Sequence, residues 1–205
     1  MTNPVIDAIL SRGTTKYYDP AATLSDDEIS ELVRIGTAAP TSFHLQNWRF
    51  IAVRTPEAKA RLSPIAWNQP AITDAAVSFI MVGQLADSSV IPERLAPLVE
   101  SGVMPAAMVP EWEIPARDLY MDFPQRQRDE AVRTATFGAA AMMYAARSLG
   151  LGSTPMIGFD AEAVASEFGL GEHEIPVMIL SIGPERPGNW AQKPRRPVTE
   201  VLDLV

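Results

Sequence analysis

Apolar residues recur along this chain in two patterns, one with the spacing of helices and one with the short continuous runs of buried strands. Helical spacing predicts a short helix over residues 4–11, a long one over residues 128–149 and another over residues 160–168. Short apolar runs predict strands over residues 49–53, 76–83, 153–157 and 175–183. Because helices and strands alternate along the chain, the pattern favours the α+β or the α/β class.

Two further helices are marked by their first turns. Ser25 to Glu28 has the order of a capping box, and the apolar residues on either side would complete a hydrophobic staple. This helix should end before Pro40, because the residue before a proline avoids helical backbone angles. Thr55 and Pro56 open the other helix, with proline at the first helical position.

The long helix is apolar on almost every side over residues 135–146, where Gly138 is followed by three alanines. A helix without a polar face must be buried on all faces, and its small residues would let another helix approach closely. Before it, residues 92–123 are rich in proline and predict short helices that form a lid-like excursion. Residues 184–205 are expected to form a C-terminal extension, because their proline-rich, basic first part cannot make a core of its own.

Composition narrows the classes of function. The chain has 205 residues, a formal net charge of −8 and no cysteine. Its acidity argues against nucleic-acid binding, which needs a basic footprint, and the missing thiols exclude disulfides and zinc–thiolate sites. With His44 and His173 as the sole histidines, we expect no metal site. No secretory signal and no membrane-spanning stretch is visible, so we expect a cytoplasmic protein without membrane contact.

The sequence also lacks the motifs of several catalytic classes. It has no Gly-x-Ser-x-Gly elbow and no phosphate-binding P-loop. Gly150 and Gly152 fail as a dinucleotide fingerprint, because Pro155 takes the third glycine position. The chain thus offers few strong catalytic side chains of its own. This favours a bound cofactor that carries the chemistry, although a binding role without catalysis fits these observations equally well.

Basic residues gather in two short windows of this acidic chain. Five of the 17 lysines and arginines fall in residues 11–16 and 192–196. Arginine can hold a phosphate with two parallel hydrogen bonds, and lysine adds a point charge. The two windows together are therefore a candidate phosphate site, with a pair of solvated basic loops as the alternative.

Two other loops combine polar groups with aromatic or tightly turned backbone. Residues 39–48 place hydroxyl, imidazole and amide groups around aromatic side chains, which suits the faces and edge of a flat heteroaromatic ring. In residues 152–159, Pro155 and Gly158 bracket a tight turn after a strand, where a free main-chain N–H could meet a ligand. Each segment taken alone is also explained as an ordinary turn.

These four segments occur in the order, and at about the spacing, of motifs in the nitroreductase family of FMN enzymes. Residues 12–19 resemble the family's Arg-x-Ser-x-Lys/Arg-x-Phe-Asp motif, and residues 40–48 resemble Pro-Ser-Ser-x-x-x-Gln-x-Trp. Residues 155–159 are similar to its Pro-x-x-Gly-Phe turn, and residues 193–195 to its C-terminal Lys-x-Arg. The resemblance implies an α+β, nitroreductase-like fold in which residues 1–205 form a single domain with a central mixed β-sheet flanked by helices.

The resemblance also implies a role for each matching residue. Arg12, Lys193 and Arg195 would face the phosphate of FMN, and Lys16 would stabilise the negative charge of the reduced flavin near N1 and the C2 carbonyl. The rest of the implied FMN site is Gly13, Thr14, Pro40, Thr41, Ser42, His44, Gln46, Asn68, Pro155, Met156, Ile157 and Gly158. Ile157 and Ala71 stand where some members carry glutamate and a second lysine, which leaves Lys16 as the main candidate for tuning the flavin.

The implied protein is an intertwined homodimer with FMN in its interface, the loop at residues 40–46 reaching the partner's flavin. Hydride would pass from NAD(P)H by a ping-pong reaction to a small electron-poor acceptor such as a nitroaromatic or a quinone. Phe43, Trp67 and Phe123 are candidate substrate-binding residues, with a plain core role as the alternative for each. The open alternatives are enone reduction or reductive dehalogenation on the same fold, a flavin-binding module with little turnover, and a structural protein without a cofactor.

Overall fold

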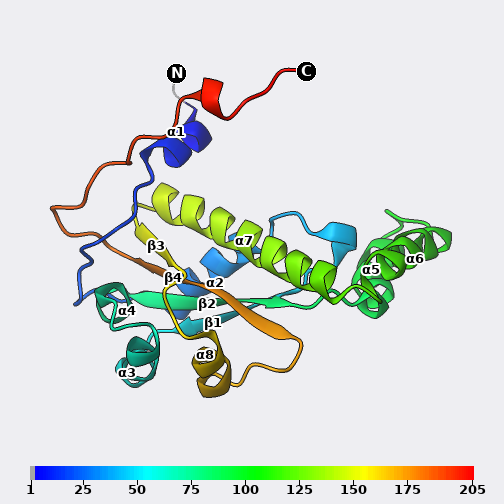
Figure 1. The fold of residues 1–205 in the computed structure, drawn as a ribbon, viewed down its shortest axis with the longest axis horizontal. Helices are drawn as coiled ribbons and strands as arrows, with labels where there is room; N and C mark the ends of the chain where they lie inside the picture. The colour runs from blue at the N-terminus through cyan, green and yellow to red at the C-terminus, as the bar shows by residue number, and fades with distance from the viewer. Residues whose placement is uncertain (1–2) are drawn as a thin grey trace.

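Four strands form one sheet in the computed structural model of the chain, which describes residues 3–205. Across the sheet their order is β1 (Trp48–Val53), β2 (Val77–Gln84), β4 (Glu174–Gly183) and β3 (Gly152–Met156) (Figure 1). Each bound lies within one residue of the predicted one. Helices flank this sheet, so the predicted α+β fold is confirmed.

The expectation of a mixed sheet is wrong for the strands of this chain. Every neighbouring pair, β1 with β2, β2 with β4, and β3 with β4, is antiparallel. Within residues 3–205, parallel pairing is limited to an isolated bridge between Thr14 and Ser153, at the outer edge of β3. An apolar run identifies a buried strand but carries no information on its direction, which depends on how the intervening helices return the chain.

One face of the sheet is covered by the long helix. α7 (Pro124–Ser148) lies against this face with α2 (Asp26–Gly36) beside it, and α1 (Pro4–Ser11) packs on α7 (Figure 1). Phe79 and Met81 of β2 point into this layer. Because side chains of a strand alternate between its two faces, the neighbouring residues of β2 serve the other layer.

The opposite face is covered by shorter helices, α3 (Pro56–Ile65), α4 (Pro70–Asp74) and α8 (Ala161–Glu167). Ile80 and Val82 of β2 pack there. The central strand is therefore buried on both sides, which explains its continuous apolar run.

The helix starts predicted at Ser25 and at Thr55 are confirmed. The Ser25 Oγ accepts from the Glu28 N–H at 3.3 Å, and the Glu28 carboxylate accepts from the Ser25 N–H at 2.8 Å, which completes the capping box of α2. The Thr55 hydroxyl oxygen caps α3 by accepting from the Ala58 N–H at 3.2 Å. α7 begins at Pro124, four residues before the predicted start, because the exposed first turn of this helix carries no apolar signal.

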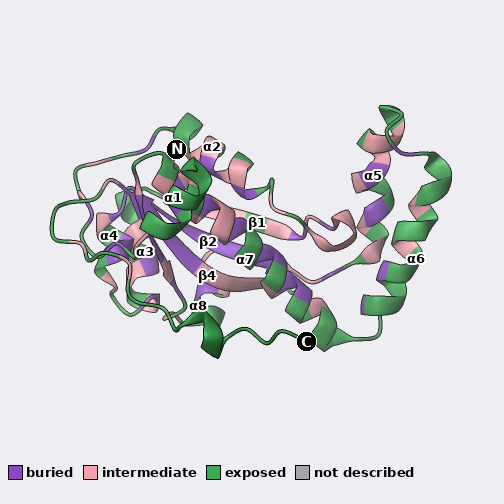
Figure 2. Ribbon diagram, turned by 90° about the horizontal axis from the view of Figure 1, so that it is seen from above, coloured by how far each residue is buried: buried purple, intermediate pink, exposed green. Residues whose placement is uncertain are grey.

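Beyond the sheet, two helices form an arm. α5 (Ile91–Glu100) and α6 (Val109–Tyr120) project from one end of the molecule, and their outer surface is largely exposed (Figure 2). The arm has a small apolar cluster of its own, which Leu45 joins from the loop before β1. The predicted short helices of residues 92–123 are thus confirmed. One proline opens the first turn of each, and a second, Pro97 or Pro115, lies inside the helix.

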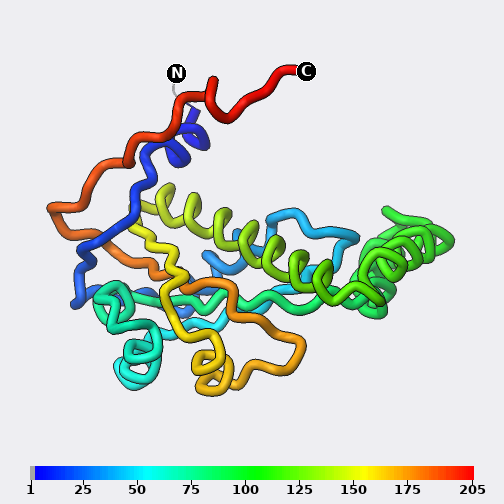
Figure 3. Tube along the Cα trace, viewed as in Figure 1, coloured from blue at the N-terminus to red at the C-terminus, as the bar shows by residue number. Residues whose placement is uncertain are grey.

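The C-terminal extension runs back to the N-terminal segment. After β4, Glu185 forms an antiparallel bridge with Tyr18, and the Asp19 N–H donates to the Pro184 carbonyl at 2.9 Å. Figure 3 traces the two segments, in blue and brown, past the same end of the sheet. The rest of the extension, with η4 (Val198–Glu200), is exposed.

α7 is not covered on every side by its own chain. Phe137 is 46% exposed and Tyr144 is 37% exposed, and both lie on the face that points away from the sheet. The expectation that residues 135–146 are buried on all faces is therefore not met within a single chain.

No helix among the described residues is long and apolar enough to cross a bilayer.

Gly83 offers a test of how closely α7 packs on the sheet. A methyl group on Gly83 would overlap the backbone carbonyl of Ala131 in α7, whereas one on Gly171 meets open space. Gly83→Ala should lower the free energy of unfolding by about 1–3 kcal/mol or more, since neither backbone can move aside freely. Gly171→Ala is the matched control. Equal urea-unfolding midpoints for the two variants would contradict this packing.

Candidate functional site

A small cavity opens where the N-terminal segment meets the C-terminal extension. We call it the cradle; its volume is about 170 Å³. Both basic windows contribute to its wall, although they come from opposite ends of the chain. Its lining consists of Arg12, Gly13, Thr14, Lys16, Gly188, Trp190, Ala191, Gln192, Lys193 and Arg195. The structure thus brings together six of the residues that the sequence assigned to the cofactor.

Positive charge in the cradle is unpaired. The cations that line it are Arg12, Lys16, Lys193 and Arg195. Among the salt bridges of residues 3–205, none involves any of these four side chains. Arg196 differs, because its Nε lies 3.1 Å from the Glu200 carboxylate. A group of cations without carboxylate partners, in a chain of net charge −8, makes the cradle a candidate anion site.

Backbone pairing with β3 fixes one wall of the cradle. The Thr15 N–H donates to the Ser153 carbonyl at 3.1 Å, next to the bridge formed by Thr14. Three residues further on, the buried Tyr18 hydroxyl donates to the Ser181 carbonyl of β4 at 3.0 Å. Burial raises the pKa of Tyr18 well above its usual range, so this hydroxyl remains a donor at neutral pH.

Asn189 fixes the other wall. Its side-chain oxygen accepts from the N–H groups of Lys16 and Tyr17 at 2.7 and 2.9 Å, and its amide donates back to the Tyr17 carbonyl at 3.0 Å. A Cβ on Gly13 would lie 3.1 Å from the Trp190 carbonyl, so the two segments leave little room for a side chain at this position. Neither Asn189 nor Trp190 is predicted from the sequence as a site residue. Their one local signal is the preceding Pro187-Gly188 turn.

Polar atoms are left without partners beside the cradle. Within the described residues, the buried Gln192 Oε1 and the Ser153 Oγ form no hydrogen bond in the protein alone. Buried polar groups are nearly always satisfied. Because a glutamine amide can turn to present either its oxygen or its NH₂ group, Gln192 can offer a donor to an anion in the cradle.

The turn after β3 lies against the loop between α3 and α4. A Cβ on Gly158 would lie 2.9 Å from the Trp67 indole, and the Gln69 side chain donates to the Gly158 carbonyl at 2.8 Å. Ile157 beside it is 81% exposed. Within residues 3–205 the N–H groups of Ile157 and Gly158 donate no hydrogen bond to the protein, so the expected free main-chain donors are present. Asn68 adjoins this contact, and Pro155 and Met156 precede the turn.

The loop from Pro40 to Gln46 lies far from the cradle of its own chain, next to the arm. Its η1 turn (Ser42–His44) contacts the arm and not the cradle (Figure 1). Thr41 Oγ1 accepts from the Gln46 N–H at 3.2 Å, and the Gln46 amide lies 2.9 Å from the His44 ring nitrogen. One chain therefore does not unite all the residues assigned to the cofactor.

Backbone strain marks both loops. The non-glycine residues with positive φ in the described chain are Phe43, His44, Gln46, Trp67 and Asn68. A left-handed backbone angle costs such residues of order 1–3 kcal/mol and often marks a binding site. All five fall in segments that the resemblance assigned to the flavin or its substrate.

The three candidate pocket residues lie in different surroundings. Trp67 is 69% exposed beside the β3 turn. Phe43 packs edge-on against Tyr120 in the arm, with ring centroids 6.4 Å apart. Phe123 lies before α7, where the Arg126 guanidinium covers its ring. The single chain does not bring these rings together.

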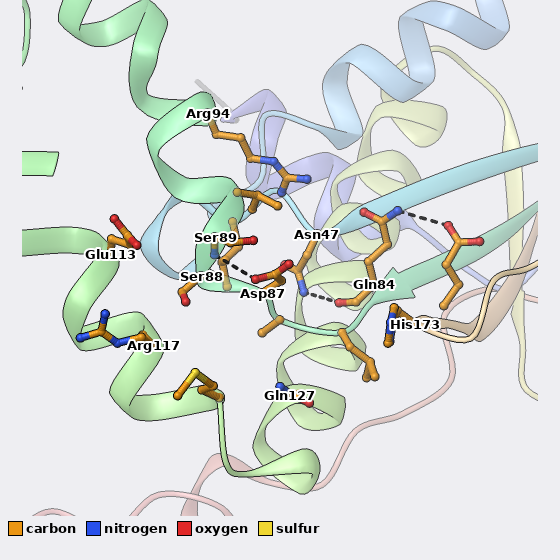
Figure 4. A pocket seen from close by; sticks show the side chains of 16 residues that line it. Asn47, Gln84, Asp87, Ser88, Ser89, Arg94, Glu113, Arg117, Gln127 and His173 are labelled. Carbon is orange, nitrogen blue, oxygen red and sulfur yellow. Dashed lines mark hydrogen bonds between the residues drawn. The ribbon is translucent and has the colours of Figure 1, made fainter. Parts of the chain in front are cut away.

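A larger cavity, of about 580 Å³, lies between the arm and the end of β2 (Figure 4). Arg94 of α5 and Arg117 of α6 reach it from the arm, and Gln84 and His173 line it from the sheet side. The sequence analysis did not predict this cavity. It is lined by none of the residues assigned to the cofactor. Among the described residues, no cluster of acidic residues and histidine could hold a metal ion.

A family model described as the nitroreductase family matches residues 9–184. The chain belongs to the nitroreductase family. YodC of Bacillus subtilis (strain 168), whose name carries a provisional NAD(P)H nitroreductase designation, is 31% identical over 183 residues, which cover 89% of this chain and 90% of YodC. The predicted family is therefore confirmed by sequence.

Solved structures agree with the nitroreductase fold. A provisionally designated nitroreductase from Exiguobacterium sibiricum 255-15, crystallised in complex with FMN, aligns with a TM-score of 0.91 at 24% identity and covers 100% of this chain and 98% of its own. The chain is also similar to the CLA biosynthesis enone reductase of Lactiplantibacillus plantarum, with 24% identity over 187 residues, which cover 89% of this chain and 86% of the relative.

Proposed function

We propose that this nitroreductase uses FMN to pass hydride from NAD(P)H to a small electron-poor acceptor such as a nitroaromatic or a quinone. The observation that carries the proposal is the cradle, whose lining includes four unpaired cations and which lies beside the edge of β3 at Ser153. The FMN complex of the Exiguobacterium neighbour supports it. Bound FMN would supply the hydride chemistry, and the protein would supply position and electrostatics.

The cradle fits a phosphate monoester. Arg12, Lys193 and Arg195 offer charged donors, and the Thr14 hydroxyl and the Gln192 amide offer neutral ones. Charge-assisted hydrogen bonds of this kind are about twice as strong as neutral ones. The sequence has no dinucleotide fingerprint for a second phosphate, so we favour FMN over FAD.

Beyond the phosphate, the chain continues as a platform for a flat ring. β3 leads from Ser153, beside the cradle, to the turn with the free N–H groups of Ile157 and Gly158. Lys16 would place its ammonium near the pyrimidine end of the ring, where a cation stabilises developing negative charge. Trp67 and Asn68 would border the ring, and the exposed indole offers an apolar surface to an aromatic acceptor.

Function is tested by flavin content and reduction. The flavin released by acid from the purified protein should co-migrate with FMN. Its visible absorbance should bleach anaerobically with NADH or NADPH and return with a nitroaromatic, a quinone or an enone. Bleaching by neither nucleotide would favour the flavin-binding module, and the acceptor that reoxidises fastest would separate nitro, quinone and enone reduction. Release of FAD, or failure of the refolded chain to take up FMN, would overturn the proposal.

Arg195 and Arg196 form a matched pair for testing the cradle. Arg195 lines it, whereas Arg196 is paired with Glu200 outside it. Arg195→Ala should weaken FMN binding by roughly 10- to 100-fold, the value of a charge-assisted hydrogen bond, and Arg196→Ala should leave it nearly unchanged. Fluorescence titration of flavin-free protein measures both. Equal losses would mean that the extension holds a different register.

We further propose that the active form is a homodimer in which each flavin contacts both chains. The exposed Phe137 and Tyr144 on α7 leave an apolar helix face for a second copy. The loop at residues 40–46 lies away from its own cradle and would serve the partner's.

Complementation tests the shared site. One variant carries Arg12→Ala and Lys16→Ala, the other Thr41→Ala and Ser42→Ala. After the two are unfolded and refolded together, each mixed dimer should contain one intact site and one with both defects. Activity should return to about a quarter of the wild-type level if assembly is random. Mixed dimers that form without recovered activity would show that both segments serve the same chain's flavin.

A further inference from the structure

A chain of hydrogen bonds links the loop at residues 40–46 to a buried carboxylate on α7. The Ser42 hydroxyl lies 2.9 Å from the Tyr120 hydroxyl at the end of α6. The Tyr120 hydroxyl in turn donates to Glu130 Oε2 at 3.0 Å. Glu130 is only 3% exposed, so its contacts are made inside the protein and not to water.

Glu130 is held from its other side as well. The Arg133 guanidinium forms an ion pair with it, and the Thr134 hydroxyl donates to Glu130 Oε1 at 3.2 Å. A carboxylate paired with arginine only accepts hydrogen bonds. The charges and hydroxyls around this carboxylate therefore all present protons to it.

Because Glu130 only accepts, it fixes the direction of each hydrogen bond between it and Ser42. Tyr120 has a single hydroxyl proton, and burial raises the pKa of Tyr120, so the phenol keeps that proton at neutral pH. Because the proton points to Glu130, the Tyr120 oxygen can only accept from Ser42. The single proton of Ser42 is then used inside the protein, and its oxygen has only lone pairs left for a ligand.

We propose that Tyr120 and Glu130 are positioning residues that fix Ser42 as a hydrogen-bond acceptor toward the flavin. Ser42 would then bind a donor of FMN, either the ring N3–H or a ribityl hydroxyl, and would reject the ring carbonyls and N1, which only accept. This inference rests on the proposed function, because it takes Ser42 to lie against a flavin.

The arrangement also connects the arm to the site. Tyr120 belongs to α6, and its ring packs edge-on against Phe43, the neighbour of Ser42, with an interplanar angle of 88°. Glu130 belongs to α7, the helix that covers the sheet. A loop with strained backbone at Phe43 and His44 is thereby held from two elements at once.

The test uses FMN analogues that each lack one donor: 3-methyl-FMN for the ring N3–H, and 2′-, 3′- and 4′-deoxy-FMN for the ribityl hydroxyls. Full-length protein freed of flavin is titrated with each by fluorescence. In the wild type, the analogue that lacks the proton given to Ser42 should bind roughly 3- to 10-fold more weakly than FMN, as expected for one neutral hydrogen bond. The identity of that analogue decides between ring and ribityl donors.

Ser42→Ala should abolish this discrimination, and Tyr120→Phe and Glu130→Gln should reduce it toward the Ser42→Ala value. In Glu130→Gln, the glutamine amide can donate to the Tyr120 oxygen. The Tyr120 hydroxyl can then donate to Ser42, so both hydrogen bonds run in the opposite direction. Asp129→Asn is the matched control: Asp129 is the exposed neighbour of Glu130 and accepts from Gln125 at 2.7 Å. It should leave the discrimination unchanged.

Failure of this inference is distinct from failure of the proposed function. Suppose that Ser42→Ala abolishes the discrimination between FMN and the analogue, but that both Tyr120→Phe and Glu130→Gln leave it unchanged. This result would overturn the positioning role, while Ser42 would keep its flavin contact. Discrimination absent from the wild type would overturn the acceptor role of Ser42. A wild-type chain that binds no FMN would overturn the proposed function itself. Because Glu130→Gln preserves shape, it decides the matter even where Tyr120→Phe misfolds.

Discussion

The N-terminal segment is held against the free edge of β3, and the cradle exists because of this attachment. Thr14 and Thr15 pair with Ser153, and the C-terminal extension closes over them through Asn189. Residues from the two ends of the chain thereby share one small cavity. Neither basic window has enough apolar residues to pack in place by itself. Hydrogen bonds to the edge of the sheet therefore fix the N-terminal window, and Asn189 joins to it the extension that carries the other one.

Charge makes this attachment responsive to a ligand. Four cations line one cavity, and no carboxylate of the described chain pairs with them. An anion bound in the cradle would contact all four cations only in the folded state, because the unfolded chain separates the two windows. Folding and the proposed anion binding would therefore be linked, and above its Kd the ligand would add stability in proportion to the logarithm of its concentration.

Local sequence signals predict much of the fold, whereas the rest depends on contacts between residues far apart in the sequence. Ser25 with Glu28, and Thr55 with Pro56, mark helix starts through groups within one turn, so the sequence alone predicts them. Strand direction depends on how the intervening helices return the chain, which no local pattern encodes. The prediction of a mixed sheet was wrong for this reason. The basic windows and the β3 turn were visible as motifs. Asn189 was not, because its role requires a partner segment that lies far away in the sequence.

The two halves of the assigned site explain why a single chain looks incomplete. The cradle and the β3 turn lie at one end of the sheet, whereas the strained loop with Ser42 is bonded to the arm at the other. Strain of this kind persists only where surrounding contacts impose it, and here Tyr120 contacts the loop through the Ser42 hydroxyl and the Phe43 ring. The loop is thus prepared before any ligand arrives, yet its own cradle is out of reach. In the homodimer that we propose, a second copy packed on the open face of α7 would give this loop a flavin to contact.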